Sequence, residues 1–136
     1  MAPDQSAART RTVARLVGPY LIVMATALFV RRDEMANLLP GFMADDALVL
    51  ATSAFTLMAG LAILALHPIW RGAAALVVSF VGLAATLKGA WLMIAPDWGA
   101  DATAAFIATP FALEAAAGFE ILVGLWLTYA GWLSKP

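Results

Sequence analysis

Long apolar runs, interrupted by short segments that hold most of the charged residues, dominate the pattern along this chain. As helices rising 1.5 Å per residue, four of these runs are long enough to cross the roughly 30 Å hydrocarbon core of a bilayer. We predict membrane-spanning helices over residues 13–30, 47–66, 73–95 and 111–133. The pattern therefore predicts an all-α, integral membrane four-helix bundle, with residues 1–136 forming a single transmembrane domain.

The segments between the runs give the expected turns. Residues 31–46 and 97–109 are predicted to be loops on the outer side of the membrane, and the apolar stretch 38–43 is expected to lie against the lipid headgroups. His67 and Pro68 end the second run, because proline lacks an amide donor and disfavours helix in the residue before it. The second and third helices should therefore be joined by a tight inner turn.

Composition supports a membrane location and excludes several classes of protein. The chain is 63% hydrophobic and 12% charged, and its mean hydropathy is +0.88. A water-soluble monomer of this composition would expose very large apolar patches. The net charge of −1 and the lack of a long basic tract argue against nucleic acid as a partner. Without cysteine, thiolate chemistry and cysteine-ligated metals are excluded.

The distribution of basic residues predicts the orientation. With the N-terminus inside, the cytoplasmic side holds Arg9, Arg11, Arg15, Arg71 and Lys135. Only Arg31 and Arg32 fall outside, beside a cluster of acids, which is the positive-inside pattern. Both termini are therefore expected in the cytoplasm.

An alternative interpretation concerns the first apolar run. Its basic start and the sequence Ala25-Thr26-Ala27 also resemble a signal peptide with a cleavage site. Gly18 and Pro19 interrupt the apolar core that such a peptide needs, which favours a membrane-spanning helix instead.

A weak internal repeat is visible. Displacing the chain by 64 residues places Gly18 on Gly82 and Gly60 on Gly124, and the first two runs then fall on the last two. This agreement predicts a tandem repeat of two-helix hairpins, related by an axis along the membrane normal. Chance agreement in a sequence rich in alanine and leucine is the alternative.

Two ionisable residues fall inside the predicted helices. Lys88 and Glu120 should lie about 12 Å and about 15 Å below the outer ends of their helices, at 1.5 Å per residue. Because an isolated charge at such depth costs at least about 2.5–3.5 kcal/mol, we predict a Lys88–Glu120 ion pair that faces the bundle interior. Glu114 is expected to reach the outer headgroups or to be a second acceptor for Lys88. The pair is either a site that responds to protons or substrate, or a static contact that fixes helix register.

His67 is the single histidine and has two interpretations. It could be a haem ligand or a titrating switch. A haem held between helices usually needs a second strong ligand, and no other histidine is present in the chain. We therefore favour a polar helix end, hydrogen-bonded near Trp70.

Short motifs in the second and third helices carry a family resemblance. They are His67-Pro68-Ile69-Trp70, Val81-Gly82, Leu87-Lys88-Gly89 and Ala95-Pro96. Over residues 13–98 the chain resembles an uncharacterised family of small four-helix bacterial inner-membrane proteins. The resemblance implies a multi-pass location in the bacterial inner membrane, but it supplies no activity.

These observations predict a non-enzymatic protein without cofactor or metal. We expect an accessory or structural subunit of a membrane complex, or a small homo-oligomer, with the lipid bilayer as its surroundings. A small oligomeric transporter or channel that uses Lys88 and Glu120 is the alternative. A membrane enzyme or redox carrier would need a nucleophile–base pair or a set of metal ligands, and neither is visible in the sequence.

Overall fold

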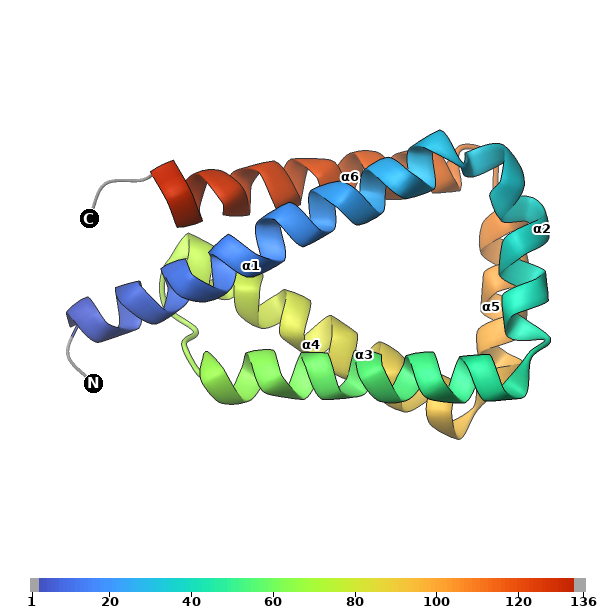
Figure 1. The fold of residues 1–136 in the computed structure, drawn as a ribbon, viewed down its shortest axis with the longest axis horizontal. Coiled ribbons are helices and arrows are strands. Elements are labelled where there is room, and N and C mark those ends of the chain that lie inside the picture. The colour runs from blue at the N-terminus through green and yellow to red at the C-terminus, as the bar shows by residue number, and fades with distance from the viewer. Residues whose placement is uncertain (1–2, 134–136) are drawn as a thin grey trace.

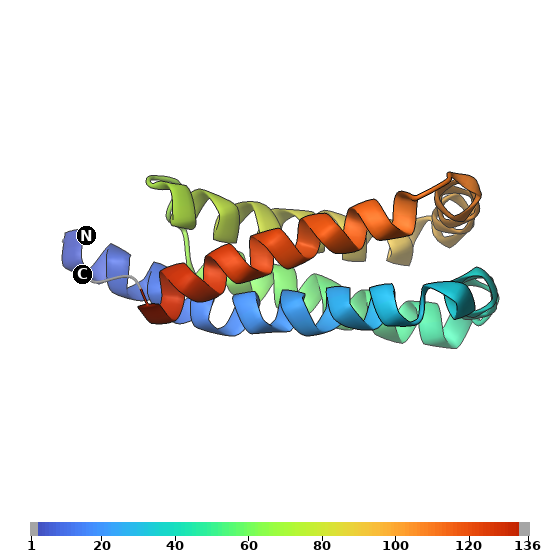
Figure 2. The same ribbon diagram turned by 90° about the horizontal axis from the view of Figure 1, so that it is seen from above.

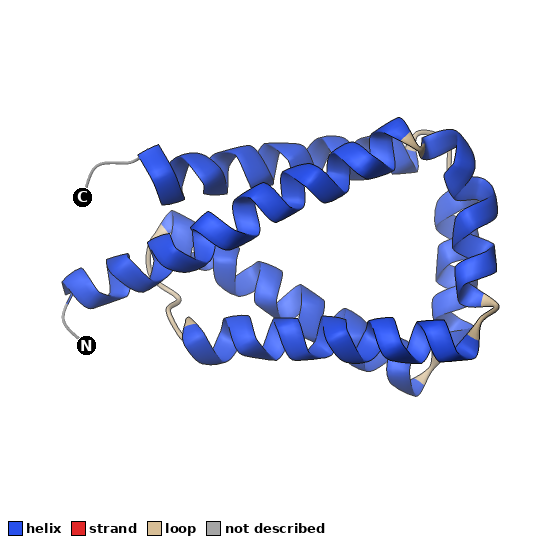
Figure 3. Ribbon diagram, in the orientation of Figure 1, coloured by secondary structure: helices blue, strands red, loops and turns tan. Residues whose placement is uncertain are grey.

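In the computed structural model, which describes residues 3–133, helices joined by short turns make up the fold (Figures 1 and 3). No strand occurs within these residues. The elements are α1 (Pro3–Val30), α2 (Arg32–Met43), α3 (Asp46–Leu66), α4 (Ala73–Ile94), α5 (Pro96–Ala108), α6 (Ala112–Thr128) and a final π-helical turn, η1 (Tyr129–Leu133).

Four of these helices are long and apolar enough to cross a membrane. They cover Gln5–Val30, Asp46–Leu66, Ala73–Ile94 and Ala112–Leu133. Large apolar side chains project from them into the surroundings, such as Ile94, which is 82% exposed, and Phe55, which is 78% exposed. Lipid is a good solvent for such side chains and water is not. The all-α fold with four membrane-spanning helices is therefore confirmed, and the chain is a multi-pass membrane protein.

The two predicted outer loops are in fact helices. Most of residues 31–46 forms α2, and nearly all of 97–109 lies in α5. Acidic residues in the first turn favour helix starts, and Pro96 occupies the first turn of α5, where a missing amide hydrogen costs nothing. Figures 1 and 2 show both helices lying crosswise at one end of the long helices, and they contact each other.

The boundaries of the long helices also differ from the prediction. α1 begins at Pro3, ten residues before the predicted start at 13, because the polar residues there continue the helix beyond the apolar run. The last helix changes character at Tyr129, where regular α-helical bonding gives way to a π-helical turn.

The long helices associate as two pairs. α1 packs along α6, and α3 packs along α4. Figure 1 shows the pairs converging toward the end where α3 stops and α4 starts, and diverging toward α2 and α5. At the converging end a small core of buried side chains joins them: Ala14, Val17, Val78 and Leu127. Among the described residues, α1 and α4 are the long helices of different pairs that contact each other most.

The fold repeats at the displacement seen in the sequence. α1 ends at Val30 and α4 ends at Ile94, 64 residues later, and α5 follows α4 as α2 follows α1. The repeating unit therefore has three helices, with a crosswise helix inside each predicted hairpin. The two long helices of the first repeat, α1 and α3, do not pack mainly against each other. Each long helix packs instead against a long helix of the other repeat.

Glycines set the close approach within each helix pair. A Cβ atom at Gly18 would lie 3.0 Å from the carbonyl oxygen of Gly124, and one at Gly60 would lie 2.8 Å from that of Gly82. A displacement of 64 residues places Gly18 on Gly82 and Gly60 on Gly124, so each of these glycine pairs corresponds to the other. The α1–α6 and α4–α3 interfaces are therefore equivalent, as two-fold pseudosymmetry requires.

Candidate functional site

The predicted Lys88–Glu120 ion pair does not form. No ion pair joins these side chains in the part of the chain that the structure describes, where Lys88 is exposed and Glu120 is half-buried. The reason lies in helix pairing, because α4 packs on α3 while α6 packs on α1. The two charges therefore belong to different helix pairs, which diverge at this level (Figure 1).

Both charges nevertheless lie on inward faces. Lys88 follows Val81 by one heptad, and Val81 packs against the buried core that joins the pairs. Glu120 precedes Leu127 by one heptad, and Leu127 belongs to that core. Residues seven apart share a helix face and lie about 10 Å apart along the axis. Lys88 and Glu120 therefore lie on opposed faces, each about 10 Å along its helix axis from a residue that belongs to the core or packs against it.

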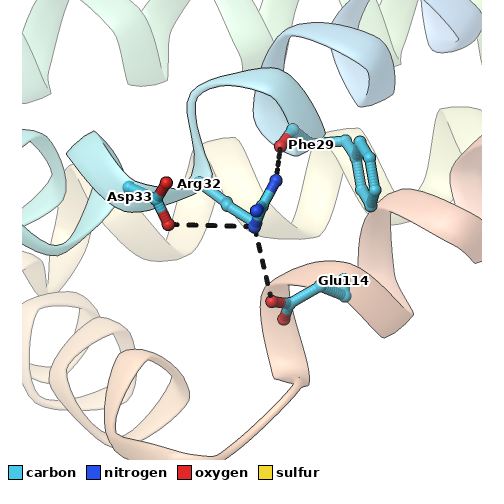
Figure 4. A network of polar contacts seen from close by, with 4 residues as sticks. All are labelled: Phe29, Arg32, Asp33 and Glu114. Atoms are coloured by element: carbon cyan, nitrogen blue, oxygen red, sulfur yellow. Dashed lines mark hydrogen bonds and ion pairs between the residues drawn. The ribbon is translucent and has the colours of Figure 1, made fainter.

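Glu114 forms an ion pair with Arg32, and within the described residues none joins it to Lys88. Its Oε1 lies 4.0 Å from Nε of Arg32, and the same Nε lies 3.8 Å from Oδ1 of Asp33 (Figure 4). Arg32 also donates from Nη1 to the Phe29 carbonyl oxygen at 3.3 Å. Of the two predicted positions for Glu114, the structure supports the one near the outer surface. There it links α6 to the junction of α1 and α2.

His67 ends α3 and connects three helices. It is fully buried, with Nε2 2.8 Å from Thr10 Oγ1 of α1 and Nδ1 3.2 Å from Ser79 Oγ of α4. Since the Ser79 hydroxyl donates to the Ile69 carbonyl oxygen, Nδ1 must donate to Ser79. In neutral imidazole Nε2 is an acceptor, so the single Thr10 hydrogen serves either Nε2 or the Ser6 carbonyl oxygen, which lies 3.0 Å from the same hydroxyl. His67 is thus a polar helix end, and one of its partners, Ser79, lies near Trp70, because Ser79 also bonds to the Ile69 carbonyl oxygen and the neighbouring Phe80 contacts the Trp70 ring.

The stability of the protein should depend on pH through His67. Burial lowers the pKa of His67 below 6.5, although its own backbone hydrogen bond opposes part of this change. As pH falls through 6.5, the unfolded chain binds the proton before the folded chain does, so acid destabilises the fold. We expect the Tm in detergent to fall between about pH 7.5 and about pH 5.5, the range in which histidine titrates. The fall should be smaller in His67→Gln, and equal curves would contradict this role.

Arg15 makes an equivalent connection that the sequence did not reveal. Its Nε donates to the Gly131 carbonyl oxygen at 2.7 Å, and its guanidinium lies 5.2 Å from the centre of the Trp132 ring. The displacement of 64 residues places Arg15 on Ser79 and His67 on Gly131. The Arg15–Gly131 and Ser79–His67 hydrogen bonds thus occupy corresponding positions in the two repeats but use different chemical groups. Only an alignment of the repeats could have indicated this correspondence.

Metal-binding clusters are not found among the described residues. Within 3–133, no group of three or more histidine, cysteine, aspartate or glutamate side chains could hold a metal ion. The charged residues that stand out there are the opposed Lys88 and Glu120 and the arginines near both membrane surfaces.

The fold and these residues define a multi-pass helical membrane protein built from two three-helix repeats. Comparisons with protein-family models, with curated proteins and with solved structures found no match to this chain.

Proposed function

We propose that this protein is a non-enzymatic subunit that binds other membrane-embedded helices, in a larger complex or in a homo-oligomer. The observation that carries the proposal is Lys88, which is exposed on the inward face of a membrane-spanning helix and has no ion-pair partner among the described side chains of residues 5–133. A charge at that depth costs at least about 2.5–3.5 kcal/mol against lipid. An acidic or carbonyl group of another protein would remove this cost.

The charge distribution supports a location in the bacterial inner membrane with both termini in the cytoplasm. Arg9 and Arg11 on the first turns of α1 and Arg71 before α4 lie at the converging end of the helix pairs. Asp33 and Asp97, in the crosswise helices, lie at the opposite end. Basic residues are enriched on the cytoplasmic side of membrane proteins, which supports placing the converging end there.

Gentle detergent extraction with mass spectrometry tests the proposal. We expect the wild-type chain to bring down a defined protein in fixed ratio, or to run as a homo-oligomer. Lys88→Met should reduce this association at least about tenfold, which corresponds to about 1.4 kcal/mol. The matched control is Leu87→Met, because Leu87 is the neighbouring residue and is 61% exposed. Equal association of both variants would refute the role of Lys88.

A small oligomeric transporter or channel is the second candidate. It is favoured by the opposed positions of Lys88 and Glu120 and by the parallel repeat, which some carriers use. If the purified oligomer moves ions or solutes across liposome membranes, Lys88→Met together with Glu120→Gln should abolish that flux. Flux that both substitutions leave unchanged would eliminate this candidate.

A further inference from the structure

A cavity lies at the basic end of the molecule, apart from Lys88 and Glu120. Its volume is about 310 Å³, and its wall comes from the start of α1, the turn after α3 and the first turn of α4. The polar side chains of the lining are Ser6, Thr10, Arg11 and Arg71. Small alanine side chains form much of the remaining wall.

The two arginines give this cavity a positive charge that no ion pair within residues 5–133 neutralises. Arg11 is half-buried and Arg71 is exposed, and neither has an ion-pair partner among the described side chains of residues 5–133. The ion pairs found in these residues use Arg31 and Arg32 at the other end of the molecule. Two guanidinium groups that line one cavity repel each other, and an anion bound between them is attracted to both.

The start of α4 adds amide donors to the same wall. Gly72 is the N-cap residue of this 22-residue helix and makes no side-chain cap hydrogen bond, and no acidic residue occupies the first turn. Gly72, Ala73, Ala74 and Ala75 all line the cavity. The amide groups of a first helical turn have no partner within the helix and carry a partial positive charge. They therefore reinforce the field of the two arginines.

We propose that this cavity binds the phosphate group of an anionic ligand. Guanidinium groups match the oxygen geometry of phosphate and can bind it through two hydrogen bonds at once. A volume of about 310 Å³ is at the lower end of small-molecule sites, which suits a phosphate with a short substituent. Because the cavity lies at the end of membrane-spanning helices, the phosphate belongs either to a lipid headgroup or to a soluble phosphorylated molecule.

Ligand binding to the detergent-solubilised full chain tests the proposal. Native mass spectrometry would compare short-chain phosphatidic acid, short-chain phosphatidylcholine and inorganic phosphate as probes. We expect phosphatidic acid to bind, and Arg11→Gln together with Arg71→Gln to weaken it at least tenfold. Arg9→Gln is the matched control, since Arg9 is exposed on the same helix but does not line the cavity.

A second variant separates loss of binding from loss of folding. Ala73→Glu places an acid in the first turn of α4, where negative charge stabilises a helix, so the fold should be retained while phosphate is repelled. Competition by inorganic phosphate would identify a soluble ligand, and its failure to compete would identify a lipid headgroup. Equal binding by wild type, the double variant and Ala73→Glu would overturn the proposal. An equal loss in Arg9→Gln would also overturn it, because the binding would then reflect general charge. The residues differ from those of the proposed subunit interface, so either proposal can fail alone.

Discussion

Replacing Gly60 with alanine should strongly destabilise the packing of α3 on α4. The added Cβ atom would collide with the backbone nitrogen of Thr86 and lie 2.8 Å from the carbonyl oxygen of Gly82. Backbone atoms of a packed helix cannot turn aside as a flexible side chain can. Overpacking costs about 1–3 kcal/mol, and we expect the upper part of that range. Thermal unfolding in detergent measures the loss.

The fold supplies both a matched control and an internal replicate for this test. Gly118 lies in α6, and an added Cβ atom there would meet nothing within 4 Å, so Gly118→Ala should be neutral or stabilising, by up to about 1 kcal/mol. Gly124→Ala should behave like Gly60→Ala, because its Cβ atom would lie 2.9 Å from the carbonyl oxygen of Gly18. Similar unfolding curves for Gly60→Ala and Gly118→Ala would contradict the helix pairing.

Leu127→Ala should have the second large effect, by loosening the junction between the helix pairs. Leu127 is fully buried and belongs to the small core at the converging end. Truncation of a buried leucine costs about 2–5 kcal/mol, and so small a core has few side chains that can fill the cavity. We expect a lower Tm in detergent, while the glycine contacts within each pair are retained.

The control for this substitution is a leucine of the same helix. Leu122 is 68% exposed, so Leu122→Ala should change stability by less than about 0.5 kcal/mol. If both leucines gave the same small change, the buried core would not be what joins the two pairs.

The four membrane-spanning helices could be predicted because hydrophobic length is a local property of the sequence. The crosswise helices α2 and α5 could not, since they mix polar and apolar residues without a long apolar run. Their helical form depends on first-turn acids such as Asp33, on Pro96, and on their contact with each other. The last of these is a tertiary feature that no local pattern contains.

The sequence indicates similar depths for Lys88 and Glu120 but not which helices pair. The rise per residue gives the depths, and helical periodicity gives the faces on which the two charges lie. Whether they meet depends on which helices pack together, and that is set by distant contacts such as Gly18 with Gly124. The same limit applies to His67, whose partner Thr10 lies 57 residues away in the sequence.

Site-specific photo-crosslinking in intact membranes tests the proposed subunit role most directly. A photoreactive residue at Ala84, exposed on α4 one turn before Lys88, probes the surface around the unpaired charge. The same residue at Phe55, which is 78% exposed, is the control for a lipid-facing surface. We predict a discrete adduct with another protein chain from Ala84 and mainly lipid adducts from Phe55. Lipid adducts alone from both positions would contradict the proposal that Lys88 lies at a protein interface.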